Sequence, residues 1–104
     1  MSENKAVLSC TALFIVIEGE RMNSRVAVIS IIVENMESTA EINKLLHANA
    51  DYIIGRMGIP YREKNVNLIS IFIDAPETVI NGLTGRIGKL DGVTAKTAYS
   101  NVIS

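Results

Sequence analysis

The sequence lacks most of the residues from which proteins build disulfides and metal sites. Its 104 residues contain one cysteine, Cys10, and one histidine, His47. A disulfide within the chain is therefore excluded, which fits a reducing cytoplasm. The usual metal site needs three or four ligands, so one chain cannot build it. We expect no metal and no cofactor, unless each subunit contributes its His47 across a symmetry axis.

Aromatic residues and charge of one sign are also scarce. There is no tryptophan, aromatics make up 5 % of the chain, and ten basic residues against eleven acidic ones give a net charge of −1. Because a nucleic-acid surface shows a basic patch or stacking aromatics, direct nucleic-acid binding is disfavoured. The apolar run at Ala12–Ile17 is too short to span a bilayer. We therefore expect a cytoplasmic protein with no membrane contact.

Residues 1–21 look unlike the rest of the chain. They lack the basic region of a signal peptide, and two interpretations stay open. The segment is an extra strand for a sheet edge or a neighbouring chain, or it is not native. The second interpretation rests on Glu18–Arg21, which purine-only codons can encode, directly before Met22. A translated ribosome-binding site would look like this, so we predict an extension at 1–21 and a folded domain at 22–104.

From Arg25 onward, strand and helix patterns alternate. Pro60 is expected to close the second strand, and residues 61–65 to form a hairpin turn before the third. The predicted strands are Val26–Glu34, Tyr52–Ile59, Val66–Ile73 and 93–99.

Two helices are expected between these strands. The first has Ser38 as its N-cap and Glu41 three residues later, which is the capping-box pattern. The second starts where Asp74 and Glu77 bracket a proline, and ends at Gly92. The order βαββαβ predicts an α+β, ferredoxin-like sandwich, with a four-stranded antiparallel sheet and two helices on one face.

Both faces of the two expected central strands are apolar. In the strand at Val26–Glu34, and again at Val66–Ile73, odd and even positions are both mostly aliphatic. Two helices cannot cover two faces, and a large exposed apolar patch is unusual on a monomer. We predict a homo-oligomer, a dimer or tetramer, with Ser30 and Ser70 on the side that faces another subunit.

The second helix contains three glycines at every third position: Gly82, Gly85 and Gly88. On a helical wheel they lie away from the apolar side. Since each exposed glycine costs about 1 kcal/mol relative to alanine, either the helix is frayed or broken, or another backbone or a ligand approaches this surface. We assign the three glycines, with the two serines, to a subunit interface. The spacing is not a dinucleotide fingerprint, because that motif opens a helix with G-x-G.

No catalytic arrangement is recognisable, and no catalytic residue is predicted. His47 is the only usual general base, there is no P-loop, and the acidic residues lie mostly in caps and turns. We therefore expect a protein that is not an enzyme.

Three segments carry a resemblance to a known family: "NKLLH", "IIGRMGIPYRE" and "LTGRIGKLDGVTAKT". Over about residues 25–103 the chain resembles the iron-only (FeFe) hydrogenase system regulators of anaerobic bacteria. The resemblance implies an ACT-like fold, similar to the C-terminal domain of nickel-responsive regulators, which form tetramers and bind effectors at subunit interfaces. Those regulators also have a histidine-rich metal set and an N-terminal ribbon-helix-helix. This chain matches neither, so nickel sensing and direct DNA binding do not carry over.

The resemblance thus implies a non-enzymatic, oligomeric regulatory module with a small-molecule effector and a hydrogenase-system protein as partner. By analogy with ACT-like sites, the candidate effector contacts are Asn35 and Met36, after the first strand, with Arg56 and Gly58 on the second. An interface salt bridge is the alternative role for Arg56. The alternative functions are a ligand-free assembly factor for hydrogenase maturation and a direct DNA-binding regulator.

Overall fold

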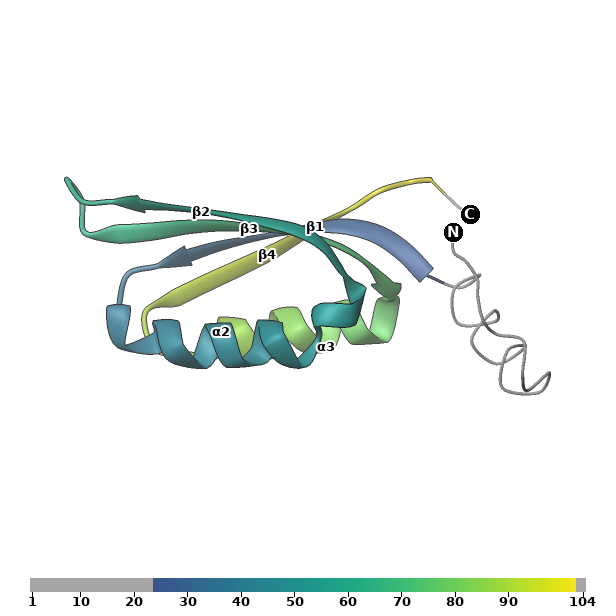
Figure 1. Ribbon diagram of the computed structural model, residues 1–104, viewed down its shortest axis with the longest axis horizontal. Coiled ribbons are helices and arrows are strands. Elements are labelled where there is room, and N and C mark those ends of the chain that lie inside the picture. The colour runs from purple at the N-terminus through teal and green to yellow at the C-terminus, as the bar shows by residue number, and fades with distance from the viewer. Residues whose placement is uncertain (1–23, 103–104) are drawn as a thin grey trace.

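Alternating apolar residues form the two central strands of a single antiparallel sheet. The computed structural model describes residues 24–102 (Figure 1). The predicted extension at 1–21 lies outside these residues. The strand order is β2-β3-β1-β4. The described elements are β1 (Ser24–Val33), the 3-10 turn η1 (Met36–Ser38), α2 (Thr39–Ala48), the 3-10 turn η2 (Ala50–Tyr52), β2 (Ile53–Tyr61), β3 (Val66–Pro76), α3 (Glu77–Gly88) and β4 (Val93–Tyr99).

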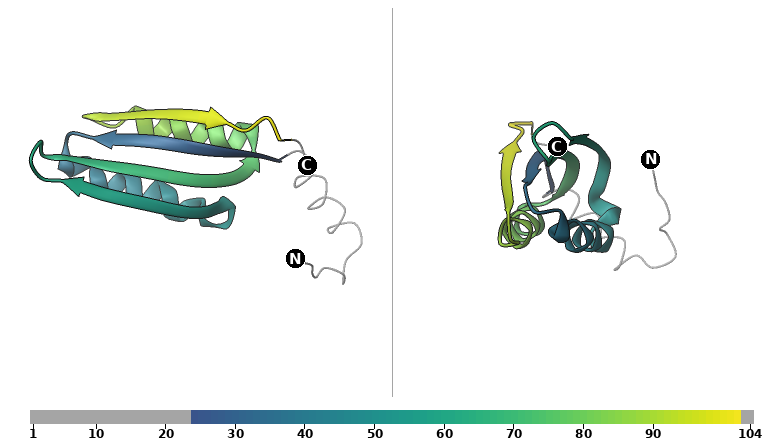
Figure 2. Two further views of the ribbon diagram at one scale, coloured as in Figure 1. Left: turned by 90° about the horizontal axis from the view of Figure 1, so that it is seen from above. Right: turned by 90° about the vertical axis from the view of Figure 1, so that its left-hand side faces the viewer.

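The arrangement confirms the predicted α+β, ferredoxin-like fold. Both helices lie against the same face of the sheet, with α3 behind β4 and β1 and α2 behind β3 and β2 (Figure 2). β1 and β3 pair without irregularity, from Ser24 opposite Pro76 to Val33 opposite Asn67, so the centre of the sheet is continuous. The other face of the sheet is bare of helices in both views.

The hydrophobic core lies between the sheet and the two helices. Every second residue of β1 and β3 points into it, and each fully buried Ile or Leu there contributes about 1.5–3 kcal/mol. The helices contribute Ile42 and Leu46 from α2 and three residues from α3. The largest fully buried side chains are Ile29, Ile31, Ile42, Leu46, Ile71, Ile73, Ile80, Leu83, Ile87 and Val33.

Three predicted boundaries were wrong because pairing in the sheet overrides local signals. Pro60 does not close β2, which continues to Tyr61. β2 is an edge strand, where a residue without an N–H is tolerated. The third strand does not end at Ile73, because Asp74 still pairs with β1 and β3 continues to Pro76. The second helix therefore begins at Glu77, the last residue of its predicted start. That helix ends at Gly88, and Gly92 lies in the loop before β4.

Ser38 is the N-cap residue of α2, as predicted, but the capping-box bond predicted there was wrong. The Ser38 side chain makes no cap bond, and its hydroxyl donates to the carbonyl of Asp91 at 2.7 Å. The chain begins to turn three residues earlier, at Asn35, whose Oδ1 accepts a hydrogen bond from the Glu37 N–H at 3.0 Å. Asn is as good an N-cap residue as Ser, so the helical segment starts with η1 and runs on into α2.

Arg25 fixes the end of β4 against β1. Its guanidinium donates to the Ser100 carbonyl at 3.1 Å, lies 3.5 Å from the Glu77 carboxylate and stacks 4.4 Å from the centre of the Tyr99 ring. Burial, and secondarily the Glu77 charge, raise the pKa of Tyr99, although Arg25 lowers it. The Tyr99 hydroxyl donates to Asn81 of α3, so this corner joins strand and helix.

Candidate functional site

The candidate site lies on the side of the sheet away from the helices, which we call the open face. Pairing with the neighbouring strands identifies its residues. Residues from the two central strands are Val26, Val28, Ser30, Ile32, Val66, Leu68, Ser70, Phe72 and Asp74. Residues from the edge strands are Gly55, Met57, Ile59, Tyr61, Thr94, Lys96 and Ala98.

Large apolar side chains of the open face are exposed to solvent. The exposed fractions are 43 % for Ile32, 39 % for Leu68, 55 % for Met57 and 52 % for Ile59. Within residues 24–102, no element covers them. The sequence-based expectation that Ser30 and Ser70 lie on this side agrees with their register, since the two serines pair directly across β1 and β3.

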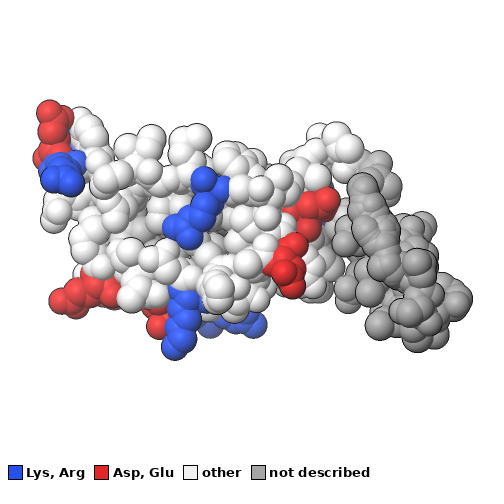
Figure 3. Space-filling view, in the orientation of Figure 1, with Lys and Arg blue, Asp and Glu red and all other residues white. Residues whose placement is uncertain are grey.

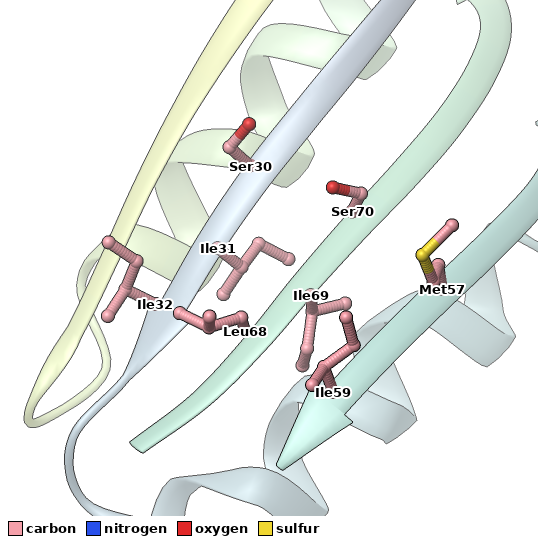
Figure 4. A pocket seen from close by; sticks show the side chains of 8 residues that line it. All are labelled: Ser30, Ile31, Ile32, Met57, Ile59, Leu68, Ile69 and Ser70. Atoms are coloured by element: carbon pink, nitrogen blue, oxygen red, sulfur yellow. The ribbon is translucent and has the colours of Figure 1, made fainter. Parts of the chain in front are cut away.

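A hollow of about 170 Å³ lies at the centre of the open face. Its polar part is the serine pair, and Met57 of β2 stands beside Ser70 in the pairing register (Figure 4). Neither serine hydroxyl makes a hydrogen bond to another part of the described chain. The hollow is lined by Ser30, Ile31, Ile32, Met57, Ile59, Leu68, Ile69 and Ser70.

Charged residues are sparse on the open face. Lys96 of β4 pairs with Ser30 and lies in the same row as the serines, while Asp74 of β3 is four residues along the strand from Ser70. In Figure 3 charged side chains lie along the helical layer, at the tip of the β2–β3 hairpin, at the right-hand end of the described residues and, for one basic side chain, across the middle of the visible face. The upper margin, where the open face lies, is white between that tip and the other end.

Two of the predicted effector contacts, Arg56 and Gly58, lie on the other side of β2. They pair with Ile71 and Ile69, which point into the core. An irregularity between Ile53 and Gly55 shifts the register there. Arg56 is exposed, and its guanidinium donates to the side-chain carbonyl of Asn43 in α2 at 3.2 Å. Its partner within the described chain is thus a neutral amide.

The other two predicted contacts are engaged at the end of β1. The Asn35 side-chain amide donates to the Asp91 carboxylate at 2.6 Å, which ties the loop after β1 to the loop before β4. The Met36 sulfur accepts a hydrogen bond from Asn67 at 3.2 Å, beside the start of β3. Three of the predicted contacts thus bond to separate residues of the chain: Asp91, Asn67 and Asn43. None of the four predicted contacts lines the hollow.

The three glycines of α3 do not break the helix, which is continuous from Glu77 to Gly88. The alternative of a broken helix is therefore wrong. A Cβ added at Gly82 or Gly85 would meet nothing within 4 Å, and one at Gly88 would lie 3.9 Å from the Cβ of Ala95. Nothing in the described part of the chain requires these glycines.

Of the residues that line the hollow, only Ser30 and Ser70 were predicted as site residues from the sequence. Apolar alternation on both sides of the central strands revealed the open face, but Met57 and Ile59 were not assigned to a site. The available signal was the serine at the middle of each central strand, since the register brings the two together. Residues 24–102 contain no group of three His, Cys, Asp or Glu side chains placed to hold a metal. No helix among them is long and apolar enough to cross a membrane.

The strand order and the two helices on one face define an ACT-like domain of the ferredoxin-like class. A family model described as "iron-only hydrogenase system regulator, putative" matches residues 25–97. The chain therefore belongs to the TM1266-like family of iron-only hydrogenase system regulators.

Solved structures agree with this assignment. The uncharacterized protein TM1266 from Thermotoga maritima is 30 % identical, with a TM-score of 0.70 over 73 % of this chain and 96 % of that one. The C-terminal domain of MgtC from Mycobacterium tuberculosis is 12 % identical, with a TM-score of 0.57 over 79 % and 94 %. A formyltetrahydrofolate deformylase from Pseudomonas putida is 14 % identical, with a TM-score of 0.56 over 74 % and 29 %. These two share the fold alone. No curated protein matches the sequence.

Proposed function

We propose that this protein is a non-enzymatic, oligomeric regulatory module of the iron-only hydrogenase system, acting in the cytoplasm of an anaerobe. It binds a small effector where subunits meet and transmits the binding to a protein of that system. The family supports the regulatory role. The observation that carries the oligomer is the open face, whose exposed aliphatic side chains have no cover among residues 24–102.

The size of the open face supports a subunit contact. With about 3.4 Å per residue and about 4.8 Å between strands, four strands of seven to eleven residues give a footprint of roughly 600 Å². The accessible area is larger, because side chains stand out from the sheet. A stable protein interface buries about 800 Å² on each partner. Two such faces together reach the lower end of the roughly 1,200–2,000 Å² that specific interfaces bury in total, which supports a dimer through this face.

If another chain covers the open face, the polar groups at its centre become buried and need hydrogen-bond partners. The hydroxyls of Ser30 and Ser70 would lose water, and each buried hydroxyl without a partner costs about 1–3 kcal/mol. The serines therefore need hydrogen bonds from a second copy or from a ligand. This requirement connects the subunit contact with effector binding.

Two groups of residues are candidates for the effector contact. The first is the group predicted from the sequence: Asn35, Met36, Arg56 and Gly58. In this group the positive charge of Arg56 is not neutralised by its hydrogen-bond partner, the side-chain amide of Asn43. The second is the hollow on the open face. Arg56→Ala would lower the affinity for an effector that binds to the first group, and would leave unchanged the affinity for an effector that binds in the hollow.

The oligomer is tested by light scattering coupled to size exclusion, and by native mass spectrometry, at micromolar concentration. We expect a dimer or tetramer for the wild type, and a monomer for Ile32→Lys and Leu68→Lys, because a buried unpaired ammonium is strongly unfavourable. Val102→Lys is the matched control, since Val102 is 68 % exposed and follows the end of β4. A monomeric wild type would refute the proposal. A molecule retained in the native spectrum would favour an effector-binding regulator over a ligand-free assembly factor.

A further inference from the structure

We propose that the hollow around Ser30 and Ser70 is the effector site, that it takes a small aliphatic carboxylate, and that a second copy of the open face completes it. The inference rests on the proposed function and specifies its ligand and place. It differs from the sequence-based candidate around Arg56, which lies on the opposite side of the sheet.

The hollow is incomplete in one chain. Its volume is about 170 Å³, whereas small-molecule sites usually enclose about 300–1,000 Å³. It opens outward, between the side chains seen in Figure 4. Two hollows that face each other would enclose twice the volume of one, which falls within the usual range.

The position of the hollow favours such a pairing. The serine row lies between the apolar row of Val28 and Phe72 and the apolar row of Ile32 and Leu68. In a two-fold contact each residue near the axis meets its own copy. If the two-fold axis passes through the middle of the apolar surface, it lies close to the serine row. The hollows of the two copies then face each other.

The lining specifies an aliphatic ligand with a polar end. The side chains around the hollow are Ile32, Leu68, Ile59 and Met57, and methionine adapts to irregular shapes. The polar groups are the two serine hydroxyls, which have no hydrogen-bond partner in the described chain. Hydroxyls can both donate and accept, so they fit an oxygen-bearing group and give it a fixed position.

The charge beside the hollow favours an anion. Lys96 lies next to Ser30 on β4 and is exposed. The acidic residues nearest along the strands, Asp74 on β3 and Glu34 just after β1, are each four residues from a serine of the pair, about 13 Å along an extended strand. The nearest fixed charge is therefore positive, and a carboxylate held by the serines would lie closer to Lys96 than to Asp74.

The test uses the full chain and isothermal titration with three probes of equal chain length: hexanoate, hexan-1-ol and hexylamine. Titrations are made at a concentration at which light scattering shows the oligomer. We expect hexanoate to bind at least about tenfold more tightly than the other two probes. The Ser30→Ala/Ser70→Ala double variant should lose about tenfold in hexanoate affinity. Lys96→Met should bind hexanoate and hexan-1-ol about equally.

Two control variants distinguish the hollow from a site on the helical side of the sheet. Lys89→Met removes a lysine at the end of α3, on the helical side, and should leave hexanoate affinity unchanged. Arg56→Ala should also leave it unchanged. Loss of binding in Arg56→Ala, with binding retained in the serine double variant, would move the site to the other side of the sheet and overturn the inference.

The oligomeric state distinguishes the failure of this inference from the failure of the proposed function. An oligomer that binds hexanoate no better than hexan-1-ol overturns the inference and leaves the oligomeric module intact. Hexanoate binding of wild-type strength by a Val28→Lys monomer, whose substitution lies on the open face but outside the lining of the hollow, would show that no second copy is needed, which also overturns it. A monomeric wild type would overturn both the further inference and the proposed function.

Discussion

Among the glycines in residues 24–102, Gly92 is the one at which an added Cβ would meet the closest contacts. Its φ is +68°, and a Cβ added there would lie 2.6 Å from the Cβ of Asn35 and 2.9 Å from its backbone nitrogen. The loops at this point are held together by the Glu34 N–H, which donates to the Gly92 carbonyl at 2.7 Å, and by bonds from Asn35 and Ser38 to Asp91. Neither loop can move away from the added atom without breaking these bonds.

We therefore predict that Gly92→Ala lowers the free energy of unfolding by about 2 kcal/mol or more, from backbone strain and the contact with Asn35. Urea denaturation followed by circular dichroism measures it. Gly58→Ala is the control, because a Cβ at Gly58 would meet nothing within 4 Å. If both variants unfolded at the wild-type urea concentration, this account of Gly92 would be wrong.

At the scale of elements, the sequence predicted which strands are central but misplaced several ends. Nearly continuous apolar runs, aliphatic at odd and even positions alike, identified β1 and β3, since strands with both faces covered have this pattern. The signals at Pro60, Asp74 and Ser38 were local, and contacts distant in sequence decided those ends. Ser38 bonds Asp91, and Asp74 pairs with Val26 of β1. No local pattern shows which distant partner a side chain will find.

The helix α3 provides a prediction at this scale. Replacing Gly82 or Gly85 with alanine should stabilise the folded chain by about 1 kcal/mol each, because alanine is the better helix former and the space for a Cβ is free. Thermal melting and light scattering should be measured together. If these glycines form a subunit contact, as the sequence analysis expects, the same variants will dissociate the oligomer. A variant that is neither more stable nor altered in mass would contradict both accounts.

At the scale of the whole molecule, the open face was predictable and the hollow was not. Composition and alternation required an apolar surface that two helices could not cover, and the register of β1 and β3 supplied the serine pair at its centre. The candidate contacts drawn from family analogy proved to lie on the helical side or in the loops. The depth of a hollow depends on how neighbouring side chains spread on the finished sheet, which no single strand encodes.

A chain stabilised by a second copy of itself should melt at a temperature that depends on concentration. For a dimer of this size, a tenfold rise in protein concentration should raise Tm by roughly 4 °C, since association favours the folded state. Ile32→Lys should melt at one temperature throughout, because the monomer has no association to gain. Val102→Lys should behave as the wild type does. A wild-type Tm that stays constant over a hundredfold range of concentration would mean that the open face is not held by a second copy, and that its exposed aliphatic side chains serve a different partner.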